Sequence, residues 1–154
     1  PFLVSASLIG VMAQRLIRIV CPNCKESYKP SKAIIKKWGL QDRSDIVVYR
    51  GKGCDECKGT GYHGRTGIFE LMSIDDETKE MIISSASTVA LREKARKIGM
   101  RTLWEDGRDK VLRGITTFEE VARVCEERVE LKEEKKEKEA QRYVRPVDVQ
   151  AGPK

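Results

Sequence analysis

The chain has 154 residues, of which 40% are hydrophobic, 35% are charged and 6% are aromatic, and its formal net charge is +6. This length suggests one domain, or one domain with an appendage, built around a small core. The charges are mixed along the chain and aromatic residues are sparse, which favours an ordinary solvated surface over a nucleic-acid interface. Gln14, Arg15 and Arg18 interrupt the most apolar stretch, so we expect a soluble domain without a membrane-spanning segment.

Two helices and two strands are predicted in the first half of the chain. Apolar residues at helical spacing predict an amphipathic helix over residues 2–20 that leads into Cys21. Ser31 is a suitable N-cap and Gly39 a suitable terminator for a short second helix that carries Trp38. A β-branched run at residues 46–48 and an alternating pattern at residues 66–74 predict two short strands.

From Asp75 onward the pattern predicts helices, which fall within residues 73–86, 87–100, 101–115 and 116–131. Thr117 and Glu120 have the spacing of a capping box at the start of the last of them. The stretch at residues 105–110 is interpreted first as a helical charge cluster and only second as an acid/base pair. Residues 132–154 lack an apolar face and are predicted to be a charged, extended or disordered tail.

Four of the five cysteines form the pattern C-x₂-C, 29 intervening residues, C-x₂-C, namely Cys21, Cys24, Cys54 and Cys57. This spacing is a strong signal for one tetrahedral Zn²⁺ site, because each two-residue gap lets both sulfurs of a tight turn point at one metal. Four sulfur ligands leave no open coordination position, so the zinc would be structural. Four ionised thiolates and one Zn²⁺ would lower the net charge from +6 to +4.

The residues around the cysteines suit such a site. Pro22 would stiffen the first turn, while Gly59 and Gly61 would let the second turn its backbone N–H groups toward sulfur. Three lysines could offset the negative thiolates: Lys25, Lys52 and Lys58.

Other interpretations of the cysteines remain open at this point. Two disulfides or a redox dithiol are disfavoured, since the sequence has no signal peptide and neither pair starts a helix. The unit C-x-x-C-x-G-x-G at residues 54–61 also occurs in the zinc domain of DnaJ-type co-chaperones, and a nucleic-acid-binding zinc ribbon is a third possibility. Cys125 is expected to be a small buried hydrophobe and His63 a surface residue.

Three long stretches of the sequence closely resemble the C-terminal region of the secretion ATPases that drive type II secretion and type IV pilus assembly. They begin with "LIGVMAQRLIRIVCPNCKESY", continue with "GCDECKGTGYHGRTGIFELMSID" and end with "LREKARKIGMRTLWEDGRDKVLRGITTFEEVARV". The fold implied is α+β and mostly helical: the C-terminal part of a RecA-like α/β ATPase domain with a Cys₄ zinc arm and a helical bundle. The implied divisions are a helix from the end of the ATPase core (1–20), the tetracysteine zinc-binding arm (21–64), a strand and helical subdomain (65–131) and the tail (132–154).

The resemblance also implies a function. Such an ATPase works as a homohexamer on the cytoplasmic face of the inner membrane and passes its motion to a membrane platform protein. Cys21, Cys24, Cys54 and Cys57 would hold one structural zinc per chain. ATP and Mg²⁺ would bind only to the full-length parent, because this sequence contains no Walker A motif, G-x-x-x-x-G-K-[ST], and starts at Pro1 as if cut from a larger protein.

Arg65, in "GRTG", is expected where the chain re-enters the ATPase core. There it would contact a nucleotide phosphate or a neighbouring subunit. The alternative is a local ion pair with an acidic residue such as Glu70. No direct nucleic-acid contact is expected.

Overall fold

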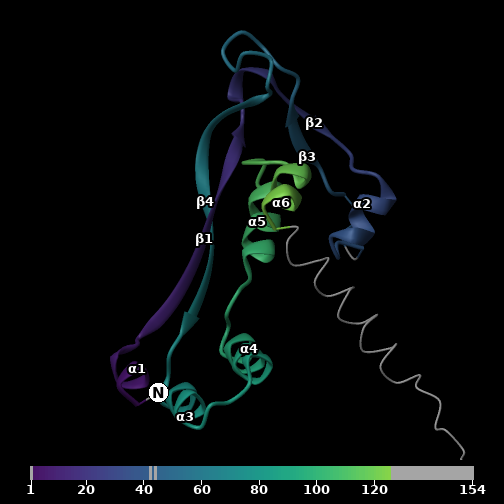
Figure 1. Cartoon of the computed structure of the whole chain (residues 1–154). Helices are drawn as coiled ribbons and strands as arrows, with labels where there is room; N and C mark the ends of the chain where they lie inside the picture. Colours follow the sequence, from purple (N-terminus) through teal and green to yellow (C-terminus); the bar gives the residue numbers. More distant parts are fainter. Residues whose placement is uncertain (1, 42, 44, 126–154) are drawn as a thin grey trace, which may run out of the picture. The chain divides into compact units, whose positions relative to one another are not determined.

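The computed structural model describes residues 2–41, 43 and 45–125 (Figure 1). The chain divides into two units, residues 1–124 and 125–154. The predicted tail at 132–154 and the end of the helix predicted over 116–131 lie outside the described residues. The fold below is that of the first unit.

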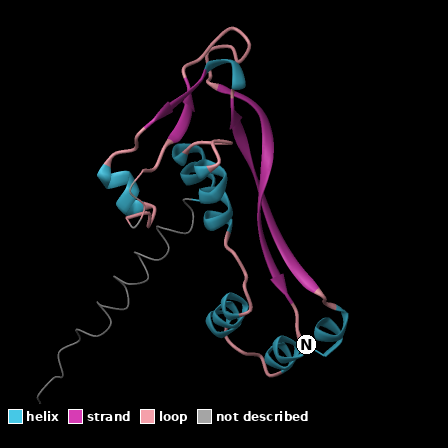
Figure 2. Cartoon of the chain, turned by 180° about the vertical axis from the view of Figure 1, so that it is seen from behind, coloured by secondary structure: helices cyan, strands magenta, loops and turns pink. Residues whose placement is uncertain are grey.

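A long antiparallel ribbon of two strands organises this unit (Figures 1 and 2). The short helix α1 (Phe2–Ser7) precedes strand β1 (Gly10–Val20), which pairs with β4 (Tyr62–Ser73). The register runs from Gly10 opposite Ser73 to Val20 opposite Tyr62, with an irregularity between Arg18 and Val20. The ribbon therefore brings the residues just before the first cysteine pair next to those just after the second.

The helix predicted over residues 2–20 is wrong beyond Ser7, because residues 10–20 form β1. The apolar positions fit a helical period, but the end of the segment is rich in β-branched residues, including Ile17 and Ile19. Such residues suit a strand when a partner is available. The partner, β4, is distant in sequence, so the pairing could not be seen from local periodicity.

Residues 21–61 connect the two strands of the ribbon. A 3₁₀ turn, η1 (Pro22–Cys24), leads into β2 (Lys25–Tyr28), which pairs with β3 (Val48–Gly51) in a second antiparallel sheet. Helix α2 (Lys32–Lys37) lies between them in sequence. Its cap is confirmed, since the Ser31 hydroxyl accepts from the N–H of Ile34, and Gly39 follows the helix with a φ of 63°.

Within the described part of the chain, four helices follow β4, as predicted: α3 (Asp76–Ile83), α4 (Thr88–Lys97), α5 (Leu103–Leu112) and α6 (Phe118–Cys125). They do not form one bundle. Helix α3 lies against α1 and α4, whereas α5 lies against β4, β1 and β3. Helix α6 packs tightly on α5, because a Cβ on Gly107 would lie 2.5 Å from Cγ1 of Val121.

The capping box is found at a different helix from the one predicted. At α5, Thr102 and Glu105 each bond to the other's backbone N–H. At α6 only half of the motif forms, because the Thr117 hydroxyl accepts from the N–H of Glu120 while the Glu120 carboxylate faces β1 instead.

The buried core joins the arm to the helices. Trp38, at the end of α2, is 3% exposed, stacks on Trp104 of α5 at 3.9 Å between ring centroids, and lies 4.5 Å from the ring of Phe118. Val48 of β3 and Val111 of α5 are fully buried. The arm predicted over residues 21–64 therefore folds back onto α5 and α6 at its α2 and β3 end. None of the helices in the described ranges is long and apolar enough to cross a bilayer.

Candidate metal centre

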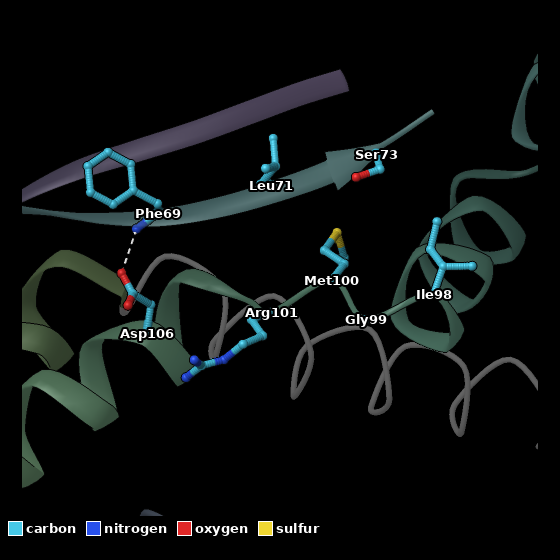
Figure 3. Close-up of a pocket in the computed structure, with 8 residues that line it drawn as sticks. All are labelled: Phe69, Leu71, Ser73, Ile98, Gly99, Met100, Arg101 and Asp106. Carbon is cyan, nitrogen blue, oxygen red and sulfur yellow. Dashed lines mark hydrogen bonds between the residues drawn. The ribbon is translucent and has the colours of Figure 1, made fainter. Parts of the chain in front are cut away.

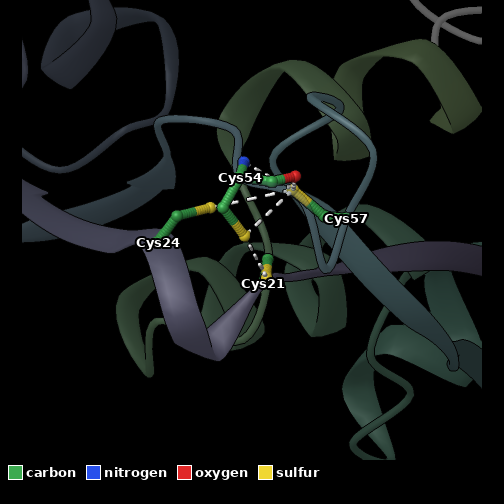
Figure 4. Close-up of side chains that lie close together, drawn as sticks. All are labelled: Cys21, Cys24, Cys54 and Cys57. Atoms are coloured by element: carbon green, nitrogen blue, oxygen red, sulfur yellow. Dashed lines mark hydrogen bonds between the residues drawn. The ribbon is translucent and has the colours of Figure 1, made fainter.

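The four predicted ligands come together from two turns. Cys21 follows β1 directly and Cys24 closes η1, while Cys54 and Cys57 lie in the turn after β3 (Figure 4). The ribbon register and the β2–β3 pairing place these two turns side by side. The four cysteines lie at the ends of elements or in turns.

The distances between the sulfurs fit a tetrahedral metal. The Sγ atoms are 3.8 Å apart for Cys21 and Cys54, 3.9 Å for Cys24 and Cys57, and 3.7 Å for Cys54 and Cys57. All four Sγ atoms lie within 4.8 Å of one another. A tetrahedron with Zn–S bonds of ~2.3 Å has edges of ~3.8 Å, so the cluster has the dimensions of a Cys₄ zinc site.

These distances exclude disulfides among the four residues. An S–S bond is ~2.0 Å long, and all four cysteines are free thiols. The cluster is partly shielded from solvent, since Cys21 is fully buried and Cys57 is 5% exposed, whereas Cys24 and Cys54 are half-buried. We conclude that the four sulfurs form one closed site.

Backbone N–H groups supply the polar surroundings of the sulfurs. Gly53 donates to Sγ of Cys24 at 3.3 Å, and Cys54 and Gly61 both donate to Sγ of Cys57 at 3.2 Å. Such bonds favour the thiolate, which is the form that binds metal. The predicted role of Gly61 is confirmed, whereas Gly59 instead donates to the carbonyl of Cys54.

The thiol pKa values follow from these contacts. Burial alone would raise the pKa of Cys57, but the N–H groups of Cys54 and Gly61 lower it to about 6. Burial raises the pKa of Cys24 to about 12, since the Gly53 N–H only partly opposes it and the neighbouring thiols add to it. The site therefore holds one readily ionised thiol, Cys57, beside two thiols with raised pKa values, Cys24 and Cys54, which need a cation to become thiolates.

Two of the three lysines expected to offset the thiolates contact other groups. Lys25 lies over the ring of Tyr49, 4.3 Å from its centroid, and Lys52 forms an ion pair of 2.8 Å with Glu26. Arg50 also pairs with Glu26, so the carboxylate of Glu26 links β2 to the end of β3. The charge of the sulfurs is thus met mainly by backbone dipoles.

Arg65 lies on β4, exposed, directly across the ladder from Arg18. Its side chain makes no hydrogen bond or ion pair within residues 2–41, 43 and 45–125. The local pair with Glu70 is not formed, because residues five apart on a strand point to opposite faces and Glu70 accepts instead from the N–H of Leu103. His63 is exposed, as predicted.

Sequence reasoning missed a buried carboxylate that links β1 to α6. Glu120 is 1% exposed; its Oε1 accepts from the N–H of Arg18 at 3.0 Å, and its Oε2 lies 2.6 Å from the guanidinium of Arg18. Arg123 pairs with the same carboxylate at 2.7 Å. The only signal in the sequence was the capping-box spacing, which assigned Glu120 a different partner.

A pocket of about 340 Å³ lies between β4 and the connection from α4 to α5 (Figure 3). Its walls are largely apolar, and its two charged residues are already engaged. Asp106 accepts from the N–H of Phe69 and pairs with Lys110, and Arg101 pairs with Asp109. The cluster at residues 105–110 is a helical charge cluster, as predicted, in which Glu105, Asp106, Asp109 and Lys110 form ion pairs. Among the described residues, the buried Nε of Arg108 has no hydrogen-bond partner.

Fold and site together define an α+β domain with a tetracysteine cluster that could hold a metal ion. A family profile described as "Type II/IV secretion system protein" matches residues 1–123. The chain belongs to this family.

Three curated relatives show the same relationship. A protein named type IV pilus assembly ATPase PilB, from Thermus thermophilus, is 47% identical over 79% of this chain and 14% of its own length. Type II secretion system ATPase E from Vibrio cholerae is 46% identical, and type II secretion system protein E from Pseudomonas aeruginosa 44%; each match covers 82% of this chain and 25% of the relative. The chain therefore spans a quarter or less of the length of these relatives.

Proposed function

We propose that the chain is a zinc-stabilised C-terminal module of a hexameric ATPase that powers type II protein secretion or type IV pilus assembly. The observation that carries this proposal is a Cys₄ cluster of tetrahedral dimensions inside a region that matches the secretion family over residues 1–123. The co-chaperone and zinc-ribbon hypotheses account for the cysteines but not for this match.

Zinc in this module would be held by Cys21, Cys24, Cys54 and Cys57. Bound zinc would supply a cross-link between the end of β1 and the turn after β3. The strands next to the cysteines would connect this cross-link to the helices. Cys24 is followed directly by β2, and β2 pairs with β3, which packs beside α5. The arm would thereby present an ordered surface for a partner.

Exposed apolar side chains support packing of the module against further protein. Phe2 and Leu3 of α1 are 68% and 78% exposed, and Met12 of β1 and Leu71 of β4 are 61% and 55% exposed. Met12 lies opposite Leu71 in the register, so these two side chains share one face of the ribbon. We propose that the rest of the ATPase and its neighbouring subunits cover this apolar surface.

The remaining parts of the proposal rest on the resemblance to the secretion ATPases. The parent would bind ATP and Mg²⁺ and act at the cytoplasmic face of the inner membrane through a platform protein, without direct contact to nucleic acid. The present chain alone is not expected to hydrolyse ATP. Arg65 would contact a nucleotide phosphate or an adjacent subunit, since its guanidinium is exposed on β4.

A chimera tests this function. Residues 1–124 replace the matching region of the Vibrio cholerae ATPase, and ATP hydrolysis, hexamer formation and zinc content are measured. We expect a zinc-containing, ATP-hydrolysing hexamer, and loss of zinc and turnover when Cys54 and Cys57 are both changed to Ser. A hexameric, zinc-containing chimera without turnover would contradict the proposal.

The role of Arg65 is tested in the same chimera. Arg65→Ala should lower ATP turnover while zinc stays bound. Arg92→Ala, at an exposed position on α4, is the control for loss of one positive charge. Equal turnover in the two variants would discard the role proposed for Arg65.

A further inference from the structure

Two glycine pairs flank the second cysteine turn symmetrically in the sequence "GKGCDECKGTG", residues 51–61. In the structure the first pair lies against the second. A Cβ on Gly51 would lie 2.1 Å from the carbonyl oxygen of Gly61, and one on Gly53 would lie 2.7 Å from that of Gly59. The two backbone segments therefore touch where any side chain would separate them.

The contact between Gly51 and Gly61 is the tighter of the two, and it leaves no room for a side chain at either position. A Cβ on Gly61 would in turn lie 2.6 Å from the carbonyl oxygen of Gly51. Every close atom in these two collisions belongs to the backbone, which cannot rotate away as a flexible side chain could. Gly61 also has a φ of 76°, in the left-handed region that favours glycine.

Gly61 connects the two cysteine turns through its own peptide groups. Its N–H donates to Sγ of Cys57 at 3.2 Å, and its carbonyl accepts from the N–H of Cys21 at 2.9 Å. One residue thus contacts a ligand of the second turn and the backbone of a ligand of the first. Gly51 is paired with Lys25 in the β2–β3 sheet, so it holds Gly61 against a strand that starts directly after Cys24.

We propose that Gly51 and Gly61 are positioning residues for the metal, and that their backbone contact sets the spacing between the two cysteine turns. A side chain at either position would push the second turn away from β3. The Cys21 N–H and the Cys57 sulfur could then no longer both reach Gly61. The four sulfurs would lose their tetrahedral spacing although every ligand is still present. This inference rests on the proposed zinc module.

Gly59 provides a matched control within the same turn. Its φ is also 76°, but a Cβ on it would meet no atom within 4 Å. Gly59→Ala and Gly61→Ala therefore introduce the same left-handed strain, and only the second introduces the collision. Gly51 has no positive φ, so Gly51→Ala introduces the collision without that strain.

The test measures zinc affinity of the 154-residue chain by competition with a chromogenic chelator, together with the visible spectrum of the Co²⁺ form. We expect Gly51→Ala and Gly61→Ala to weaken zinc binding ~10- to 100-fold, the usual effect of losing a residue that orients metal ligands. Their Co²⁺ spectra should lose intensity in the tetrahedral bands. Gly59→Ala should stay within ~3-fold of the unaltered chain, because it leaves both ligand contacts of Gly61 in place.

The outcomes separate this inference from the proposed function. If the unaltered chain binds no zinc, both fail. If it binds zinc and all three variants match it, or if Gly59→Ala weakens binding as much as Gly61→Ala, only the positioning role is overturned. If a variant is unfolded without metal, the zinc concentration that restores its far-ultraviolet circular dichroism gives the same comparison.

Discussion

The buried carboxylate of Glu120 offers the sharpest test of how the ribbon and the last helix are held together. Its side chain is fully buried, whereas the side chains of its partners Arg18 and Arg123 are 43% and 59% exposed. Burial would raise the pKa of Glu120, but the hydrogen bonds from Arg123 and Arg18 lower it from 4.5 to about 2. The ionised form is therefore strongly favoured in the folded state.

The size of the effect follows from this shift. A drop in pKa of ~2.5 at ~1.4 kcal/mol for each tenfold change corresponds to ~3.5 kcal/mol of stability. Because the folded-state pKa is the lower one, this contribution is present above pH 4.5 and is lost as the pH falls toward about 2. Removing one partner of a buried ion pair costs ~3–5 kcal/mol, and because the two arginines are partly exposed we expect Glu120→Gln to cost ~3 kcal/mol, at the lower end of this range.

Urea unfolding at pH 7 measures how far Glu120→Gln lowers the free energy of unfolding. The control is Glu119→Gln, the exposed neighbour in the same first turn of α6, which changes the same charge without a buried partner. The difference between the free energies of unfolding of the two variants should become smaller as the pH falls below 4.5. Because both variants are compared at the same pH, a loss of stability caused by release of zinc affects both and does not enter this difference. A gap under ~1 kcal/mol at pH 7 would refute the reasoning, because a buried ion pair that loses one partner costs more than that.

Three further predictions concern the core and the metal. Trp38→Ala should lower the free energy of unfolding by ~3–5 kcal/mol, because it removes a buried ring stacked between two helices; a loss under ~1 kcal/mol in urea unfolding would contradict this. Gly107→Ala should destabilise by up to ~2 kcal/mol in a thermal melt, since its Cβ would lie 2.5 Å from Val121 and the overpacking outweighs the gain of ~1 kcal/mol in helix propensity; a higher melting temperature would show that α6 moves aside. Cys57→Ser should abolish stoichiometric zinc in elemental analysis, while Cys125→Ser should retain it; equal zinc in both would remove Cys57 from the site.

The clustering of the four cysteines could be predicted from the sequence because it depends on local spacing. Each C-x₂-C pair lies in one turn, so the spacing alone named all four residues that the structure brings together. The helices after Asp75 were also predictable, since their caps and apolar periods are contained in each segment.

What the sequence could not show depends on contacts between distant residues. β1 has a helical pattern and becomes a strand only because β4 pairs with it. The partners of Glu120 and the contact between Gly51 and Gly61 likewise depend on tertiary packing. The glycines of "GKG" directly precede Cys54 in the sequence, but no local sequence pattern indicates that they contact the glycines of "GTG".

Metal content and coordination of the purified chain test the central claim most directly. Elemental analysis together with zinc X-ray absorption should give one zinc per chain, bound by four sulfurs at ~2.3 Å. A chain without zinc would contradict the account. So would two zinc ions per chain, as in a co-chaperone domain, or a first shell with nitrogen or oxygen in place of sulfur.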